Sequence, residues 1–298
     1  MNDRKLYVVG NGFDMWHGIP SGFPQFKAFV EEHDRDLLGA VDDYLPVDEK
    51  WYELESSLAA IDVDSIIDNL GHFMSSYNSD DWSDSGHHDF QYEVDRLVQR
   101  LSTGLRHLLG QWIRQLPIPT KVTAPQLLRT IDPTARFLTF NYTPTLHELY
   151  SVPDQHVLHI HGRADHPDSD MVLGHAWNPL ERKSLNDRAD IEEIDTRLME
   201  VHDILDKYFS TTFKPSARLI EEYRPCFERL VGVNDVCVLG HSLSPVDGAY
   251  FKALLAIPGI RSARWQVAYR DGDDDPLLKL LQLGVPASSI VICPWSEL

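Results

Sequence analysis

Four short segments of the chain combine glycine, asparagine or histidine with the end of an apolar run. They are Gly10-Asn11-Gly12, Asn141-Tyr142, His161-Gly162 and Gly240-His241-Ser242. Gly10 and Gly12 allow the backbone to approach a ligand closely and to adopt a positive φ, as a diphosphate-binding loop requires. The first segment is not the full G-x-G-x-x-G fingerprint, because position 15 is Met. Taken alone, it predicts either a ligand-binding loop or an ordinary tight turn.

Asn141 and His161 each have a structural interpretation beside a catalytic one. Asn141 could cap a helix that starts at Thr143-Pro144, and His161 could be a buried histidine at a strand end. His159 and His161 are two residues apart on a strand and would share a face, so a metal pair is a further alternative. The chain has 14 histidines, which makes such pairs common by chance. We therefore expect no metal.

The charge balance limits the classes of partner. Lys plus Arg total 27 and Asp plus Glu total 46, which gives a formal net charge of −19. A surface this acidic repels phosphate backbones and anionic headgroups, so we expect neither nucleic acid nor a membrane as a partner. No apolar run approaches the ~20 residues of a membrane span, and the run LYVV near the start is too short for a signal-peptide core. The sequence predicts a soluble, cytoplasmic protein.

Apolar strand patterns alternate with helical patterns along much of the chain. The strand candidates are KLYVVG, RFLTFNYT, HVLHIHG, MVLGHAW, DVCVLGHS, ARWQVAYR and SSIVIC. Strands separated by helices pair in parallel with right-handed crossovers, so we expect an α/β fold with a Rossmann-like parallel sheet. Ligands bind such sheets at the carboxyl ends of the strands, where the four segments would converge.

Two stretches of helical periodicity, at about 40–115 and 178–232, interrupt this alternation. We interpret the whole chain, 1–298, as a single α/β domain in which these two helical insertions form a cap. Within the first insertion, NSDDWSDSGHH predicts a polar surface loop that includes His87-His88. Both insertions follow strand-end segments. We therefore expect a pocket, lined by the four segments, beneath at least one insertion.

The order of the four segments resembles that of the sirtuins. G-x-G followed after five residues by Gly18-Ile19-Pro20 is similar to the first sirtuin motif. T-F-N-Y-T at 139–143 resembles the segment whose Asn lies beside the nicotinamide ribose, and His161-Gly162 resembles the H-G whose His is the catalytic base. Gly240-His241-Ser242-Leu243 resembles the G-T-S-L segment that contacts the cofactor's phosphates and adenosine ribose. The resemblance implies a sirtuin-like, NAD-binding fold.

A closer resemblance is to the AbiH-type abortive-infection proteins. Gly10 to Asp14 are similar to their G-N-G-F-D string, and Trp51 and Glu55 to their W-x-x-x-E segment. The strings F-N-Y-T, H-I-H-G and G-H-S-L-S-x-x-D resemble that group as well. We place Trp51 and Glu55 at positions i and i+4 of a helix. Glu55 then either lies on the surface or faces inward and reaches the site.

The chain departs from the sirtuin deacylases at several positions. The zinc ribbon of those enzymes needs four cysteines, whereas this chain has three and no Cys-x-x-Cys pair. Thr143 stands where the sirtuin N-I-D segment has Asp. These departures argue against protein deacylation more than against nucleotide binding.

The resemblance implies an NAD glycohydrolase that acts in phage defence, with NAD as its substrate. Asn141 would hold ribose and a water without adding positive charge as an oxocarbenium-like state develops, and His161 would act as the base. The alternative is a non-catalytic nucleotide-binding sensor or scaffold of an abortive-infection system. A phage trigger, a partner defence protein and a homo-oligomer all stay open. The residues implied to bind the nucleotide are Gly10, Asn11, Gly12, Phe13, Asp14, Gly240, His241 and Ser242.

Overall fold

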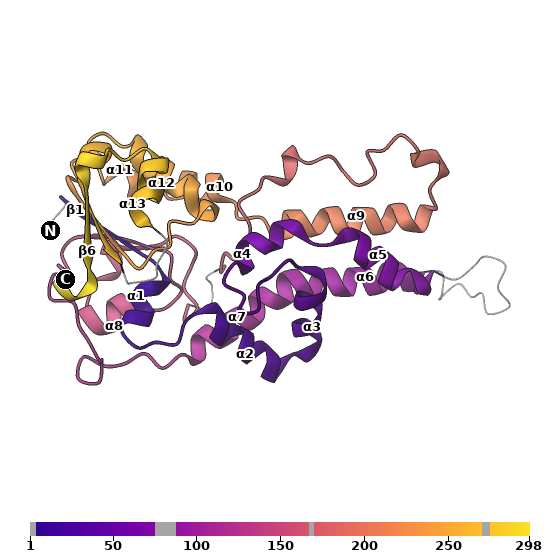
Figure 1. The fold of residues 1–298 in the computed structure, drawn as a ribbon, viewed down its shortest axis with the longest axis horizontal. Coiled ribbons are helices and arrows are strands. Elements are labelled where there is room, and N and C mark those ends of the chain that lie inside the picture. Colours follow the sequence, from indigo (N-terminus) through magenta and orange to yellow (C-terminus); the bar gives the residue numbers. More distant parts are fainter. Residues whose placement is uncertain (1–3, 75–87, 167–169, 270–274) are drawn as a thin grey trace. The chain divides into compact units, whose positions relative to one another are not determined.

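The structure, a computed structural model, describes residues 4–74, 88–166, 170–269 and 275–298 (Figure 1). Most of the predicted polar loop, including His87, lies outside these residues. The chain forms two compact units, which are described one at a time. Unit 1 comprises residues 1–22, 110–172 and 215–298, and unit 2 comprises residues 23–109 and 173–214.

Unit 1 is built on a six-stranded sheet in which every pair of neighbouring strands is parallel. The strand order is β3-β2-β1-β4-β5-β6, which is the order of the Rossmann fold. The predicted Rossmann-like parallel sheet is thereby confirmed. The strands are β1 (Lys5–Val9), β2 (Arg136–Thr139), β3 (Val157–His159), β4 (Asp235–Leu239), β5 (Arg264–Tyr269) and β6 (Ile290–Pro294).

Helices cover both faces of this sheet (Figure 1). Alternate side chains of β1 enter different cores: Leu6 and Val8 pack on one face, and Tyr7 and Val9 on the other. Strands that are buried on both faces are continuously apolar, which explains the run KLYVV. The first face carries α10 (Ser216–Glu222), α11 (Arg224–Glu228), α12 (Gly248–Ala256) and α13 (Pro276–Leu283), and the second carries α1 (Asn11–Trp16) and α8 (Thr145–Tyr150).

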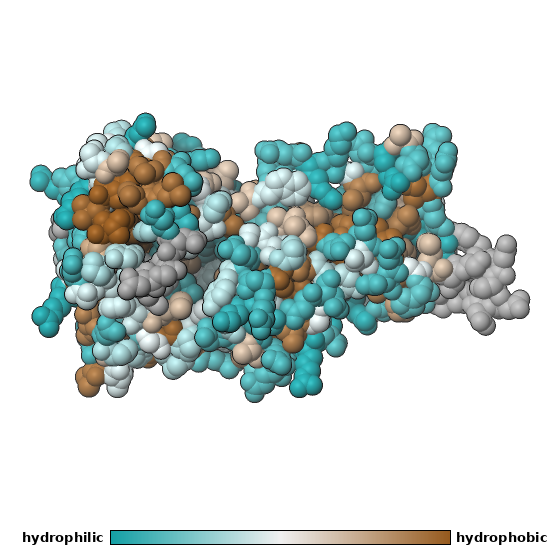
Figure 2. All heavy atoms as spheres, in the orientation of Figure 1, coloured by the Kyte–Doolittle hydropathy of each residue, from teal (hydrophilic) through white to brown (hydrophobic). Residues whose placement is uncertain are grey.

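Helix α13 exposes part of its apolar surface. Leu280 is fully buried, whereas Leu277, Leu278 and Leu281 keep 37%, 52% and 40% of their surface exposed. Figure 2 shows an apolar patch over the region where Figure 1 places α13, within a surface that is mostly hydrophilic. Only one side of this leucine-rich helix therefore belongs to the core.

Unit 2 is helical. Its α6 and α9 pack against each other through buried positions one turn apart, such as Phe90 and Val94 on α6 and Val201 and Leu205 on α9. Helix α7 spans the division between the units. The helices are α2 (Phe23–His33), α3 (Arg35–Tyr44), α4 (Leu54–Ser57), α5 (Val63–Leu70), α6 (Asp89–Gln99), α7 (Leu105–Gln115) and α9 (Thr196–Thr211), with a π-helical segment over Arg100–Gly104.

One predicted strand is wrong. MVLGHAW forms no strand and makes only an isolated bridge, between His175 and Phe213. A Cβ on Gly174 would lie 2.0 Å from the carbonyl oxygen of Thr212, so the two backbones are in direct contact there. The pairing is held by His175 N–H donating to Thr212 O and Lys214 N–H donating to His175 O, too short a ladder for a strand.

None of the helices in the described part of the chain has the length and apolar character that a membrane crossing needs.

Candidate functional site

Unit 1 brings the four predicted segments to one edge of the sheet. His161, Asn141, Gly10 and Gly240 follow the carboxyl ends of β3, β2, β1 and β4, and these four strands are neighbours in the sheet. The division between β1 and β4 is where the strand order reverses, which is the usual ligand position in open α/β sheets. The sheet topology therefore explains why segments far apart in sequence converge.

The glycines of the first and fourth segments pack against each other. The Gly12 N–H donates to Gly240 O at 2.8 Å, and a Cβ on Gly240 would lie 2.2 Å from Phe13 N. Gly240 also has a φ of +66°, which favours glycine. A Cβ on Gly10 would meet His241 Cα at 2.6 Å. These glycines therefore serve backbone-to-backbone contact, and the Gly12 N–H already has an acceptor.

Asn11 and Phe13 hold the first loop in place. The Asn11 amide donates to Ser21 O at 2.9 Å, and Ser21 Oγ donates to Asn11 Oδ1 at 2.5 Å. Phe13 is fully buried in the core between α1 and the sheet. Ser242 is exposed, and its carbonyl accepts a hydrogen bond from Lys279 Nζ at 2.9 Å.

Asp14 is a buried carboxyl group beneath the first loop, with 1% of its surface exposed. Its Oδ2 accepts a hydrogen bond from Thr143 Oγ1 at 2.6 Å, and Thr145 Oγ1 donates in turn to Thr143 Oγ1 at 3.0 Å. Burial raises the pKa of Asp14 to about 6, although the nearby polar groups of Thr143, Thr145 and Asn141 act in the opposite direction. This carboxyl group therefore changes its protonation state close to neutral pH.

Asn141 is held through its backbone and leaves its amide available. Its N–H donates to Thr139 Oγ1 at 3.1 Å, and its carbonyl accepts from His159 Nδ1 at 3.0 Å. The side chain is buried, and within the described residues its Nδ2 has no hydrogen-bond partner of standard geometry. The residue at the N-cap position of α8 is Pro144, which makes no side-chain capping hydrogen bond. The helix-cap interpretation of Asn141 is therefore wrong.

His161 faces a carboxylate that the sequence analysis did not single out. His161 Nε2 lies 3.7 Å from Asp247 Oδ1, and His241 Nε2 lies 3.4 Å from Asp247 Oδ2, with all three side chains buried. His241 Nδ1 accepts a hydrogen bond from the N–H of Leu243, so its own proton resides on Nε2 and points toward Asp247. The Asp in the string G-H-S-L-S-x-x-D was the sequence signal for Asp247.

The metal-pair interpretation of His159 and His161 is wrong. Strand β3 ends at His159 and the chain turns immediately afterwards, so the two rings do not share a face. His159 packs against His147 of α8, whereas His161 packs against Phe140 and Tyr250 on the side of α12. Across the described ranges, no group of three or more His, Cys, Asp or Glu side chains is arranged to hold a metal ion.

A cavity of about 340 Å³ lies beside the loops that follow β2 and β3. Tyr142 and Pro144 from the loop after β2 line it, together with Ala164 and Asp165 from the loop after β3. The remaining wall is mostly apolar and comes from residues 113–118. An apolar pocket with a few polar groups at its rim is a common form of small-molecule site.

Trp51 and Glu55 lie in unit 2. Trp51 precedes α4 with a left-handed φ of 59°, so the predicted i, i+4 helical pair is wrong. The Trp51 ring is fully buried and its Nε1–H donates to Asp42 Oδ1 at 2.9 Å. Glu55 is partly exposed, and its Oε1 faces inward to lie 3.0 Å from Nζ of Lys214, whose side chain is completely buried.

A comparison with protein-family models identifies this architecture. The model described as "Bacteriophage abortive infection AbiH" matches residues 6–269, which include the four segments, all of unit 2 and most of unit 1. The chain belongs to the AbiH family. Membership of this family implies a role in abortive infection, a defence against bacteriophage. No curated protein matches this AbiH chain. The predicted resemblance to AbiH proteins is confirmed, whereas the sirtuin-like NAD-binding character stays a prediction.

Proposed function

We propose that this AbiH protein cleaves the bond between nicotinamide and ribose in NAD. The observation that carries the proposal is the buried Asn141 amide, whose Nδ2 has no partner among the described residues. Asn141 lies close enough to Asp14 to influence its pKa, and His161 follows the carboxyl end of the neighbouring strand β3. A buried amide without a partner is costly in a folded protein, and a bound ligand would remove that cost.

Cleavage of the bond between nicotinamide and ribose requires neutral hydrogen-bond donors and one base. When the glycosidic bond breaks, its electron pair goes to the cationic nicotinamide, so the leaving group needs no acid. The Asn141 amide would orient ribose or water without adding positive charge beside the oxocarbenium-like carbon. Water would form the new bond to that carbon, and its proton would go to His161.

Asp247 fits the role of a positioning group for that base. A carboxylate facing one nitrogen of His161 favours the tautomer with the proton on that nitrogen. The other ring nitrogen, Nδ1, then has the basic lone pair. Aspartate residues fix the tautomer and orientation of catalytic histidines in the same way on unrelated folds.

The ribose end of NAD suits the available groups better than the diphosphate end. Asn141 and Asp14 are buried polar groups of the kind that bind hydroxyls or a carboxamide. The Gly12 N–H, by contrast, is bonded to Gly240 O, and the glycines leave no space between their loops. The proposal therefore rests on the ribose site, and other donors would have to hold the phosphates.

The test follows nicotinamide release from NAD by the purified protein, alone and with an extract of phage-infected cells as a source of trigger and partner. We expect His161→Ala to lower turnover by about 10²–10⁴-fold and Asn141→Ala to abolish it, with unchanged melting curves. His72→Ala is the matched control, because His72 is an exposed histidine of unit 2. A wild-type protein that releases no nicotinamide under either condition would overturn the proposal.

The second candidate is a sensor that binds a nucleotide without cleaving it. Its support is Thr143, which stands in place of an acidic residue and has its hydroxyl engaged by Asp14. Titration calorimetry with NAD distinguishes the two functions. Heat of binding without nicotinamide release favours the sensor.

A further inference from the structure

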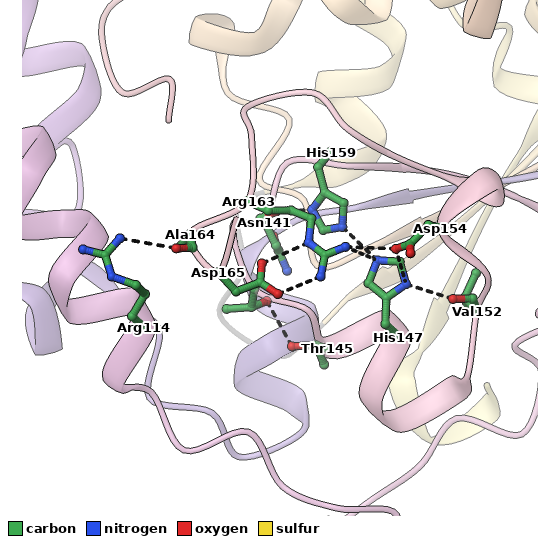
Figure 3. A network of polar contacts seen from close by, with 11 residues as sticks. Arg114, Asn141, Thr145, His147, Val152, Asp154, His159, Arg163, Ala164 and Asp165 are labelled. Atoms are coloured by element: carbon green, nitrogen blue, oxygen red, sulfur yellow. Dashed lines mark hydrogen bonds and ion pairs between the residues drawn. The ribbon is translucent and has the colours of Figure 1, made fainter. Parts of the chain in front are cut away.

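Two histidines behind Asn141 face each other through the same nitrogen. His147 Nε2 and His159 Nε2 are 3.2 Å apart. Figure 3 shows the two rings and the contact between them. Each ring uses its other nitrogen on a backbone carbonyl. His147 Nδ1 lies 2.8 Å from Val152 O, and His159 Nδ1 lies 3.0 Å from Asn141 O.

These contacts fix where the ring protons must be. A carbonyl oxygen only accepts, so both Nδ1 atoms are donors and have protons. In two neutral rings, both Nε2 atoms would then present lone pairs to each other at 3.2 Å, whereas the Arg163 Nη1 donor lies at the longer distance of 3.4 Å from His147 Nε2. One additional proton between the two Nε2 atoms turns this repulsion into an N–H···N hydrogen bond and leaves both carbonyl contacts intact.

The ring geometry favours a proton over a metal ion in this position. The ring centroids lie 5.5 Å apart, 2.3 Å more than the two nitrogens, and the planes are within 25° of parallel. This excess is close to two imidazole radii, so the rings meet head to head. Two ligands of a tetrahedral metal would instead converge at an angle. The Arg163 guanidinium, with Nη1 3.4 Å from His147 Nε2, also opposes a dication.

The charges around the pair match one extra proton. Asp154 Oδ1 lies 3.5 Å from His147 Nδ1 and 2.9 Å from Arg163 Nη1, and Asp165 pairs with Arg163 at 2.7 Å. Two carboxylates and one guanidinium leave one negative charge, which the proton balances. Burial, with the nearby charge of Arg163 acting in the same direction, lowers the pKa of His159 to about 4, so His159 is the neutral acceptor of the pair.

We propose that His147 and His159 share one proton and that this pair is the positioning unit for Asn141. His159 acts on the site through the Asn141 carbonyl, and His147 keeps the His159 ring in the tautomer that donates to it. When the pair loses the proton, one ring must change its tautomer and give up a carbonyl contact, at either Asn141 or Val152. The consequence for catalysis rests on the proposed function, but the shared proton does not.

Nitrogen NMR of the imidazole rings tests the shared proton directly in the full chain. We expect one histidine with both nitrogens protonated, coupled through its Nε2–H to the Nε2 of a second histidine. The resonances of Asn141 and Tyr142 should shift with the titration of this pair. Zn²⁺ alone is titrated in parallel by calorimetry. Stoichiometric zinc binding that shifts both Nε2 atoms, or two unprotonated Nε2 atoms in the folded protein, overturns the proposal.

Three variants separate positioning from general structure. His147→Gln keeps an N–H donor for His159 Nε2 without a titrating proton, so the pH-dependent shift of Asn141 should disappear while its resonance stays near the wild-type position. His147→Leu removes the donor, and the Asn141 resonance should move at every pH. His33→Gln is the matched control, because His33 also contacts a carbonyl through Nδ1 but is exposed. Equal effects of both His147 variants would overturn the positioning role.

The same variants keep this proposal distinct from the proposed function. If nicotinamide is released, the pH profile of the rate should flatten in His147→Gln and the rate should fall in His147→Leu. If the wild-type protein releases none, the NMR result still decides the shared proton.

Discussion

Two carboxyl groups, the buried Asp14 in unit 1 and the partly exposed Glu55 in unit 2, show different solutions to the same physical problem. Asp14 in unit 1 is 1% exposed and is held by hydroxyl groups. Glu55 in unit 2 faces the ammonium of Lys214, which has no exposed surface. Burial strongly disfavours an isolated charge, so a carboxyl group in the interior either becomes neutral more readily or acquires a cation.

This difference indicates a functional role for Asp14 and a structural role for Glu55. The raised pKa of Asp14, at about 6, means that the fold tolerates its charge at a cost. Such a cost at the carboxyl edge of a Rossmann-like sheet is typical of a functional group. The Glu55–Lys214 ion pair instead joins the segment around α4 to the segment after α9 within unit 2. Removing the charge of Glu55 should therefore lower the stability of the protein, whereas removing the charge of Asp14 should raise it.

Breaking the ion pair should have the largest effect. Glu55→Gln keeps the shape of the side chain but removes the negative charge that faces the buried Lys214. We expect a loss of about 3–5 kcal/mol in the free energy of unfolding, measured by urea denaturation. The matched control is Glu221→Gln, whose partner Arg224 is 60% exposed. This surface pair should contribute less than about 1 kcal/mol, and equal losses in both variants would contradict the comparison.

Asp14→Asn should have the opposite sign and a distinctive pH dependence. The folded-state pKa is about 6 and the ordinary value is 3.8, so the wild type loses stability as pH rises from about 4 to 6. The total loss is about 3 kcal/mol. The variant should be more stable than the wild type at pH 7 and equally stable at pH 3. A stability difference that does not vary with pH would contradict the raised pKa.

Replacing both members of the ion pair should have the smallest effect. Glu55→Leu combined with Lys214→Met removes both charges, and buried pairs replaced by apolar groups are often neutral or stabilising. We expect a free energy of unfolding within about 1 kcal/mol of the wild type. Denaturation of the two single variants and the double variant completes the cycle. Losses that add would show that the two residues act independently.

The sequence predicted strands correctly where both faces of the strand are buried. Runs such as KLYVV and DVCVL became β1 and β4, because strands covered on both faces must be apolar throughout. It failed at MVLGHAW, where composition suits a strand but Gly174 lies directly on the Thr212 backbone. It also failed at Trp51, where a left-handed backbone interrupts an otherwise helical pattern.

By itself, the sequence determined the parallel sheet and the four segments at its carboxyl edge, because hydrophobic period and glycine position are local properties of the chain. Only the tertiary structure decided what those segments touch. It paired Gly12 with Gly240, placed Asp247 beside His161, and directed His159 toward His147 and away from His161. Contacts between residues distant in sequence depend on strand order and on where each strand ends, and neither is written in any single segment.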